Sequence, residues 1–193
     1  EEGARLLAEC TPADRAAYDA LWPCFARQRG RTACGVASTA MALRALGLGE
    51  DDEAAILQRC EGDGAALPRA KIERCGMTLA ELGVLLRALE PTRLRATRVH
   101  ADAADADALV TAARGPGIVL LNYHMTSAGQ PPFGGHVSPI GAYHAPSRRL
   151  LVLDVWPETE PFWCDAAKLH AAAFSVDGES QRARGWVVVR REE

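Results

Sequence analysis

The sequence lacks a long apolar segment and an excess of charge of one sign. No run approaches the roughly 20 consecutive apolar residues that a helix needs to span a bilayer. The 22 Lys and Arg residues stand against 25 Asp and Glu residues, for a formal net charge of -3. This balance gives no long-range attraction for nucleic acid or an anionic membrane surface. We therefore expect neither nucleic acid nor a membrane among the partners of the chain.

The sequence also lacks the cysteine spacings of a metal site. Its six cysteines are scattered, with no CxxC pair and no Cys/His spacing of the zinc-site type. We predict no metal site and no cofactor. A disulfide framework is not expected in a chain of this length. Most of the cysteines are then interpreted as small buried hydrophobic residues or unused thiols in a reducing compartment.

Targeting and linker signals are missing as well. The first residues, EEGARLLAEC, are acidic and do not have the layout of a signal peptide. We expect a cytoplasmic location, with a periplasmic or exported one left open because the sequence does not begin with Met and a leader could have been removed. No internal repeat or low-complexity linker interrupts the chain, which predicts a single domain over residues 1–193.

Helical patterns dominate the first half of the sequence. Apolar residues recur at helical spacing over 34–46, and shorter helices are predicted over 52–60 and 103–114. Thr78 is a good N-cap, and Glu81 three residues later completes a capping box for another helix. These patterns predict a helical lobe over about residues 1–115.

Strand patterns follow in the second half. The run 117–122 (GIVLLN) is continuous and apolar, and segments 135–144 and 150–155 are joined by a short polar connection typical of a hairpin. A helix is expected over 166–174 and a last strand over 186–189. Helices followed by an antiparallel sheet predict an α+β domain, with a sheet lobe over about 116–193 and a site in the cleft between the lobes.

Cys34 is the candidate nucleophile. It stands where the helix of 34–46 is expected to begin, in the segment QRGRTACGVAS, and unsatisfied amide groups at a helix start lower the pKa of a thiol. Gly35 would let substrate approach the backbone. The amide of Cys34 and the side-chain amide of Gln28 could both donate to an oxyanion. An ordinary core cysteine on an amphipathic helix is the alternative interpretation.

His136 is the candidate base, at the start of a predicted strand in the segment GGHVSPI. The preceding glycines, Gly134 and Gly135, leave space beside the imidazole for a substrate carbonyl. Most single histidines on strands are structural, and this alternative applies more strongly to the other four histidines of the sequence. The local sequence therefore favours His136 as the catalytic histidine.

Asp154 is the candidate for the residue that orients the histidine. It ends an apolar strand (LVLDV), where a buried carboxylate needs a partner such as a histidine N–H. A symmetric hairpin centred on Ser147 would place Asp154 opposite Ile140, which is four residues from His136. A β-bulge near Pro139 would shift the register and bring the two side chains closer.

These segments resemble the phytochelatin synthase family of the papain-like clan. The matching motifs are QxxxxxCGxAS, GHxSPIGxYH and LxLDV, in the same order, and the similarity extends over GMTLAELGVLL, VLLNYH and SQRARGWVVV. The resemblance covers about residues 28–190. It implies a papain-like, two-lobed cysteine protease fold.

The resemblance also implies an activity. Family members cleave glutathione before its glycine, hold γ-glutamylcysteine as a thioester on the cysteine, and pass it to water or to a second thiol peptide. Cys34, His136, Asp154 and Gln28 take the catalytic positions by this resemblance. Arg184, before the last strand, would bind a substrate carboxylate. We also expect contacts with the substrate at the residues Gly135 and Asn122.

The substrate side departs from the family pattern. Pro157 stands where an arginine usually follows the aspartate, and residues 124–126 replace another arginine after the NY pair. Ala33 stands where an aromatic residue is common before the cysteine. The reaction type is therefore a firmer expectation than glutathione itself.

Alternatives to a glutathione-cleaving enzyme remain. An amidase or acyltransferase with the same mechanism could act on a different small peptide or a carrier-bound acyl chain. A non-catalytic, thiol-rich protein that binds soft metals is the alternative from another class. The expected partner is a small thiol peptide such as glutathione, and the sequence allows a homodimer.

Overall fold

The computed structural model describes residues 2–62, 64–90, 92–131 and 133–192. Its α-helices are α1 Glu2–Glu9, α2 Pro12–Leu21, α3 Cys34–Ala45, α4 Glu53–Arg59, α5 Arg69–Cys75, α6 Leu79–Leu89, α7 Ala106–Arg114, α8 Met125–Ala128 and α9 Ala166–Phe174. Its strands are β1 Leu94–His100, β2 Ile118–His124, β3 Gly135–His144, β4 Arg149–Val152, β5 Phe162–Asp165 and β6 Gly185–Arg191. No helix within these ranges has the length and apolar character needed to cross a membrane.

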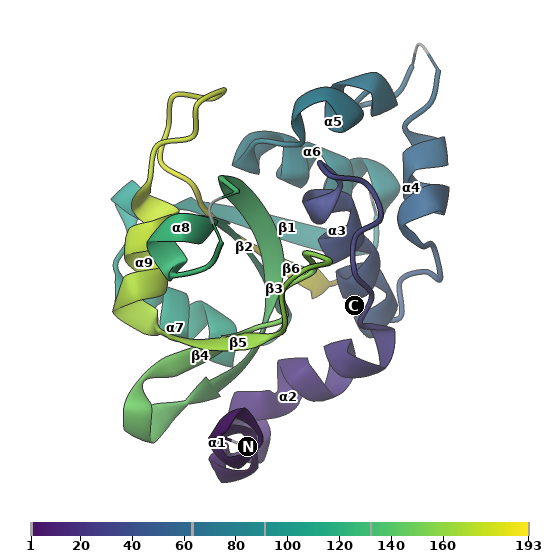
Figure 1. Cartoon of the computed structure of the whole chain (residues 1–193). Coiled ribbons are helices and arrows are strands. Elements are labelled where there is room, and N and C mark those ends of the chain that lie inside the picture. The colour runs from purple at the N-terminus through teal and green to yellow at the C-terminus, as the bar shows by residue number, and fades with distance from the viewer. Residues whose placement is uncertain (1, 63, 91, 132, 193) are drawn as a thin grey trace.

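The strands form one antiparallel sheet in the order β1-β6-β2-β3-β4-β5. Helices cover both faces of this sheet, with α3 to α6 on one side and α7, α8 and α9 on the other (Figure 1). The alternation of β2 explains the two layers. Leu120 belongs to the apolar cluster under α3 and α6, whereas Leu121 and Tyr123 belong to the cluster under α7 and α9.

Local signals in the sequence account for several helix starts. Thr78 Oγ1 accepts the backbone N–H of Glu81, and the Glu81 carboxylate accepts the backbone N–H of Thr78 at 2.8 Å, so the predicted capping box is present. Asp52 and Asp105 cap α4 and α7 in the same way, each accepting a backbone N–H three residues later.

The boundary between the lobes differs from the expectation. β1 Leu94–His100 pairs with β6, and α7 packs on the sheet through Leu109 and Val110 in the same apolar cluster as α9. The helical lobe therefore ends before residue 94 rather than near 115. β1 escaped the prediction because its sequence, LRATRVH, is that of a partly solvated edge strand with few apolar residues. That the whole chain forms a single domain stays a prediction.

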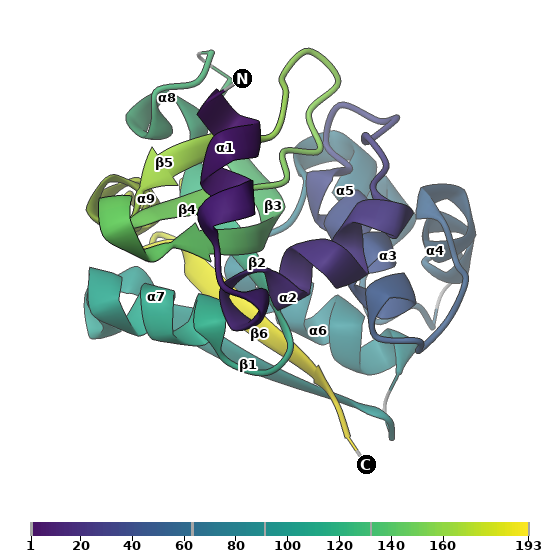
Figure 2. The same ribbon diagram turned by 90° about the horizontal axis from the view of Figure 1, so that it is seen from below.

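The first two helices complete the far side of the sheet. Figure 2 shows α1 lying across β4 and β5, where Glu2 forms an ion pair with Arg149 and the backbone carbonyl of Gly3 accepts a hydrogen bond from Trp163. These contacts lie away from Cys34. They attach α1 to strands β4 and β5 at the edge of the sheet.

Candidate active site

Cys34 is the first residue of α3, and the helix start has no capping side chain. The first backbone N–H groups of the helix therefore have no partner within the helix and are available to the Cys34 sulfur or to a bound ligand. The positive end of the helix dipole favours negative charge here. A Cβ at Gly35 would meet Cε of Met77, the flexible end of a side chain that lines the cavity. That Gly35 lets substrate approach the backbone stays a prediction.

His136 and Asp154 lie within hydrogen-bonding distance. Nε2 of His136 donates to Oδ1 of Asp154 at 2.8 Å, and both side chains are fully buried. The other ring nitrogen, Nδ1, is buried without an oxygen or nitrogen partner among the residues described. It is the nitrogen left to interact with the thiol of Cys34, which lies beside the ring.

A β-bulge at Gly141 brings this pair together. The hairpin pairs Ala142 with Leu151 but Ile140 with Val152, so one residue of β3 is extra. Leu153 then donates to the carbonyl of Pro139 at 2.9 Å, which places Asp154 opposite Ser138.

The predicted bulge therefore exists, but it lies at Gly141 rather than near Pro139. His136 is two residues from the position opposite Asp154 and on the same face of the sheet. The remaining offset of about 6.6 Å along the strand is within the reach of an imidazole and a carboxylate that lean toward each other.

The Asp154 carboxylate is held from several directions. Oδ1 accepts the backbone N–H of Trp156 at 3.0 Å, and Oδ2 accepts the hydroxyl of Thr159 at 2.6 Å. Oδ2 also accepts the side-chain amide of Gln130, whose own carbonyl accepts the hydroxyl of Tyr123 at 2.8 Å. A carboxylate with this many donors stays ionised and keeps one orientation.

The three side chains titrate as a coupled set. Burial raises the pKa of the Cys34 thiol, but the imidazole of His136 and nearby backbone N–H groups outweigh it and lower that pKa below its ordinary value. Burial likewise opposes the charged form of His136, yet the Asp154 carboxylate and Cys34 raise its pKa to about 9. Although burial alone would raise the pKa of Asp154, its bonds to His136 and Thr159 lower it. The arrangement favours a thiolate beside an imidazolium at neutral pH.

Two hydrogen bonds join the elements that carry the triad. Ser38, one turn into α3, donates its hydroxyl to the carbonyl of Val137 at 3.0 Å, and both groups are buried. The backbone N–H of Gln28 donates to the carbonyl of Val155 at 2.8 Å. Helix α3 is thereby attached to strand β3, and the loop before α3 is attached to the segment that carries Asp154.

The side chain of Gln28 does not have the predicted role in this structure. Its Nε2 donates to the carbonyls of Gly30 at 2.7 Å and Arg31 at 3.1 Å, and the residue does not line the cavity at Cys34. Both amide hydrogens are therefore used to shape the loop before α3. Donation to an oxyanion would require these bonds to break, which leaves the backbone N–H of Cys34 as the available donor.

A cavity of about 280 Å³ opens beside Cys34 and His136. Its walls come from the loop before α3, the turn between α5 and α6, the starts of β3 and β6, and the loop that follows α9. Lining residues besides the catalytic pair include Arg31, Cys75, Asn122, Phe133, Asp177 and Arg184.

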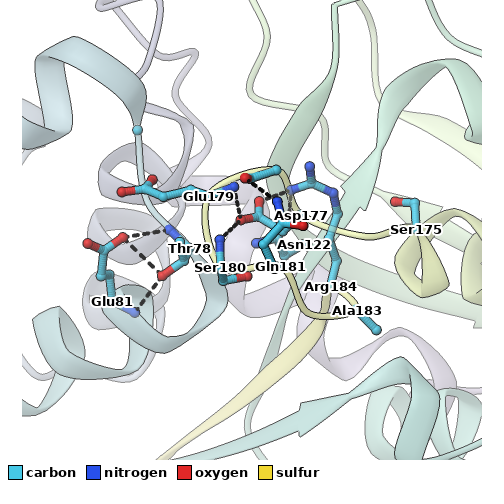
Figure 3. A network of polar contacts seen from close by, with 12 residues as sticks. Thr78, Glu81, Asn122, Ser175, Asp177, Glu179, Ser180, Gln181, Ala183 and Arg184 are labelled. Carbon is cyan, nitrogen blue, oxygen red and sulfur yellow. Dashed lines mark hydrogen bonds and ion pairs between the residues drawn. The ribbon is translucent and has the colours of Figure 1, made fainter.

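The predicted substrate residues Arg184, Gly135 and Asn122 do meet at this cavity. Arg184 Nη1 donates to Asp177 at 2.7 Å and to Oδ1 of Asn122 at 3.2 Å (Figure 3). The guanidinium fills the space that Gly135 leaves, since a Cβ there would lie 2.5 Å from Nη1. Arg184 therefore occupies the space beside Gly135, whereas the space beside Gly134 is open.

Donors on this wall remain without acceptors. Nδ2 of Asn122 and Nε of Arg184 are buried and have no hydrogen-bond partner among the described residues. Buried donors of this kind are costly unless a ligand or water satisfies them. Neither nitrogen has accessible surface, so a ligand in the cavity would reach these two donors only if the wall rearranged.

Several residues of the site were not identified from the sequence. Asp177, Gln130 and Thr159 are polar residues in irregular segments, and each meets its partner only through the folded chain. Phe133 stacks on Trp156 with ring centroids 4.0 Å apart. The one signal in the sequence was Asp177, which stands seven residues before Arg184 and could have been considered as its ion-pair partner.

The structure also bears on metal binding. Within the ranges that the structure describes, no group of three or more His, Cys, Asp or Glu side chains is placed to hold a metal ion. All six cysteines are free thiols, and Cys34 and Cys75 are the two that line the cavity.

Comparison with known proteins agrees with this geometry. No curated protein matches the chain. Among solved structures, the chain is similar to one described as a C39-like peptidase from Bacillus anthracis, with a TM-score of 0.60 and 14% identity over 88% of this chain and 95% of that chain. This similarity establishes the fold, a papain-like arrangement of helices and antiparallel sheet.

The family comparison goes further than the fold. The family model described as phytochelatin synthase matches residues 1–186 of the 193. Together with the peptidase fold, this match supports cysteine-dependent acyl transfer or hydrolysis. By this match over nearly its whole length, the chain belongs to the phytochelatin synthase family.

Proposed function

We propose that the protein cleaves a γ-glutamyl peptide, with glutathione as the first candidate, at the bond before its last residue. The acyl group would form a thioester on Cys34 and pass to water or to a second thiol peptide. The observation that carries this proposal is the sharing of one cavity by an activated thiol and by the Asp177–Arg184 pair.

In the acylation step, the Cys34 thiolate attacks the carbonyl carbon of the scissile amide. Negative charge develops on the carbonyl oxygen, where the backbone N–H of Cys34 at the start of α3 can donate to it. The His136 imidazolium then gives its Nδ1 proton to the leaving amine nitrogen as the C–N bond breaks. Asp154 stabilises the imidazolium and keeps Nδ1 directed at the sulfur.

Deacylation reverses the proton transfer. Neutral His136 takes a proton from water or from the amino group of an incoming thiol peptide, and the activated oxygen or nitrogen attacks the thioester carbonyl. The C–S bond breaks and the Cys34 thiolate is restored beside the imidazolium. The balance between the two acceptors depends on whether the cavity admits water while a second peptide is bound.

The head of a γ-glutamyl group is an amino acid zwitterion, with one carboxylate and one ammonium. Asp177 and Arg184 present one charge of each sign side by side on the cavity wall. The guanidinium of Arg184 would donate to the carboxylate, and Asp177 would accept from the ammonium. This match of charge favours a γ-glutamyl donor over a simple acyl chain.

The test is to incubate the protein with glutathione and follow both glycine release and the intact mass of the protein. We expect glycine and a γ-glutamylcysteinyl adduct that is absent in Cys34→Ser. If no glycine appears while Cys34 stays reactive toward a thiol-directed alkylating reagent, glutathione is not the donor.

A second candidate is an amidase or acyltransferase of the same mechanism with a different donor. The exposed ring of Phe133, stacked on Trp156 beside His136, favours this candidate because it offers the cavity an aromatic surface that glutathione does not need. Intact-mass measurement with a panel of aromatic and carrier-bound acyl donors separates the two, since the adduct mass identifies the acyl group.

A further inference from the structure

The cavity at Cys34 contains one cationic side chain that the preceding proposal does not use. Arg31 lines the cavity and precedes the nucleophile by three residues, in the loop that leads into α3. Its position in the loop is fixed because its backbone carbonyl accepts a hydrogen bond from the buried side chain of Gln28. The role of Arg31 follows from the charges around it.

The other charges of the cavity have partners within the protein. Arg184 pairs with Asp177 at 2.7 Å, and Glu179 shares Lys71 of α5 with Glu81. Arg31 forms no ion pair with a carboxylate among the described residues. It is therefore the lining charge that a ligand would neutralise.

The guanidinium of Arg31 is also preorganised. It lies over the ring of Phe133, 5.8 Å from the centroid, and Phe133 in turn stacks on Trp156. The side chain thus reaches from the loop before α3 to the loop before β3, and both residues line the cavity. Stacking on an aromatic face leaves the edge of the guanidinium, with its fork of N–H donors, open to a carboxylate.

We propose that Arg31 binds the carboxylate of the residue released on cleavage, so that the protein selects donors with a single residue and a free carboxylate after the scissile bond. This inference rests on the proposed function. The Asp177–Arg184 pair fits a zwitterionic head, whereas an isolated cation fits an isolated carboxylate. Glutathione presents these two groups at its opposite ends, with the scissile bond between them.

The test compares glutathione with its glycinamide analogue, in which the last carboxylate is neutral. The rate of Cys34 acylation is followed by intact mass in a single turnover, which isolates the donor from any acceptor. The wild-type protein should react about 10- to 100-fold faster with the free carboxylate, since hydrogen bonds to a charged group contribute that much.

The variants assign the preference to one side chain. Arg31→Gln should reduce the preference to about one by slowing only the reaction with glutathione, and Arg31→Lys should keep part of it. Arg29→Gln is the matched control, because Arg29 lies in the same loop but faces Asp52 and not this cavity. Its preference should equal that of the wild type.

Any of four results would overturn the inference. A preference that persists in Arg31→Gln, or that is absent from the wild type while both donors acylate Cys34, excludes this role for Arg31 and leaves the proposed function intact. If neither donor acylates Cys34 in the wild type, the γ-glutamyl donor is excluded as well. A preference that appears only when a second peptide accepts the acyl group would place the carboxylate on the acceptor.

Discussion

The catalytic carboxylate and the substrate wall differ in how completely their polar groups are hydrogen-bonded. Asp154 accepts from His136, Trp156, Thr159 and Gln130. The wall a short distance away leaves Nδ2 of Asn122 and Nε of Arg184 without acceptors. One region is complete without a ligand and the other is not. The difference indicates that the protein alone fixes Asp154, whereas it leaves two polar groups beside Asp177 unsatisfied.

The largest expected effect comes from removing the sulfur. Cys34→Ser should abolish the acyl adduct and lower turnover by several orders of magnitude, because a serine hydroxyl is not ionised in this setting. Cys75→Ser is the matched control, since Cys75 lines the same cavity but its thiol donates only to the backbone of Lys71. Activity that survives in the first variant and is lost in the second would assign the nucleophile to the other cysteine.

The second-largest effect on activity is expected at Asp154, whose carboxylate is fully hydrogen-bonded by the protein. Asp154→Asn keeps the shape of the side chain but removes the charge that raises the pKa of His136, so kcat should fall about 10³- to 10⁴-fold. In the wild type, the imidazolium is present below its pKa of about 9 and is lost as the pH rises through that value.

The activity of the wild type should therefore decline above about pH 9. In Asp154→Asn the decline should begin at a lower pH, since the pKa of His136 falls without the carboxylate. A pH profile of kcat/KM for both proteins checks this, and an unchanged alkaline limb would contradict the role of Asp154.

A smaller effect on activity is expected at the cavity wall formed by Asn122, Asp177 and Arg184. Arg184→Lys keeps the charge opposite Asp177 but loses the fork that meets a carboxylate, so KM for a γ-glutamyl donor should rise about tenfold with little change in kcat. Arg182→Lys, an exposed position in the same loop, should leave both constants unchanged. Equal effects of the two substitutions would remove Arg184 from substrate binding.

The smallest effect on activity is expected at Gln130, which donates a hydrogen bond to the Asp154 carboxylate. Gln130→Leu removes one donor to Asp154 and strands the hydroxyl of Tyr123, which should lower kcat about 3- to 10-fold and shift the alkaline limb slightly, as expected for one hydrogen bond. The double substitution with Tyr123→Phe should recover stability, measured by thermal unfolding, but not kcat. Recovery of both would mean that Gln130 acts only on the fold.

The sequence was sufficient to single out Cys34, His136 and Asp154, which the fold brings together, and insufficient for the residues that hold Asp154 in place. Their catalytic roles stay a prediction. Short motifs around Cys34, His136 and Asp154 identify the elements that carry them, because a helix start and a strand end are local features. The position of the bulge at Gly141 depends on how Leu153 packs against that residue, at 3.1 Å from where a Cβ would lie, and no local pattern encodes that contact.

The substrate wall was the least predictable region. Arg184 was expected to bind a carboxylate, but its pairing with Asp177 was not foreseen, and Gln28 uses its amide on the backbone. Both outcomes follow from side chains that satisfy one another across loops, which a linear pattern cannot show. The sequence also could not show that Arg31 is a cavity-lining cation without a carboxylate partner among the described residues.

The unpaired residue at Gly141 decides on which side of the sheet Asp154 lies. If Gly141 paired with Val152 in a regular ladder, Asp154 would lie opposite Pro139 and on the other side of the sheet from His136, because side chains alternate with a period of two. Removing Gly141 would instead make the pairs Ala142–Leu151 and Ile140–Val152 consecutive, so His136 and Asp154 would stay on the same side. Homologous chains should therefore either leave one residue unpaired here or lack it, and should tolerate length changes at the hairpin tip, Ala145–Ser147.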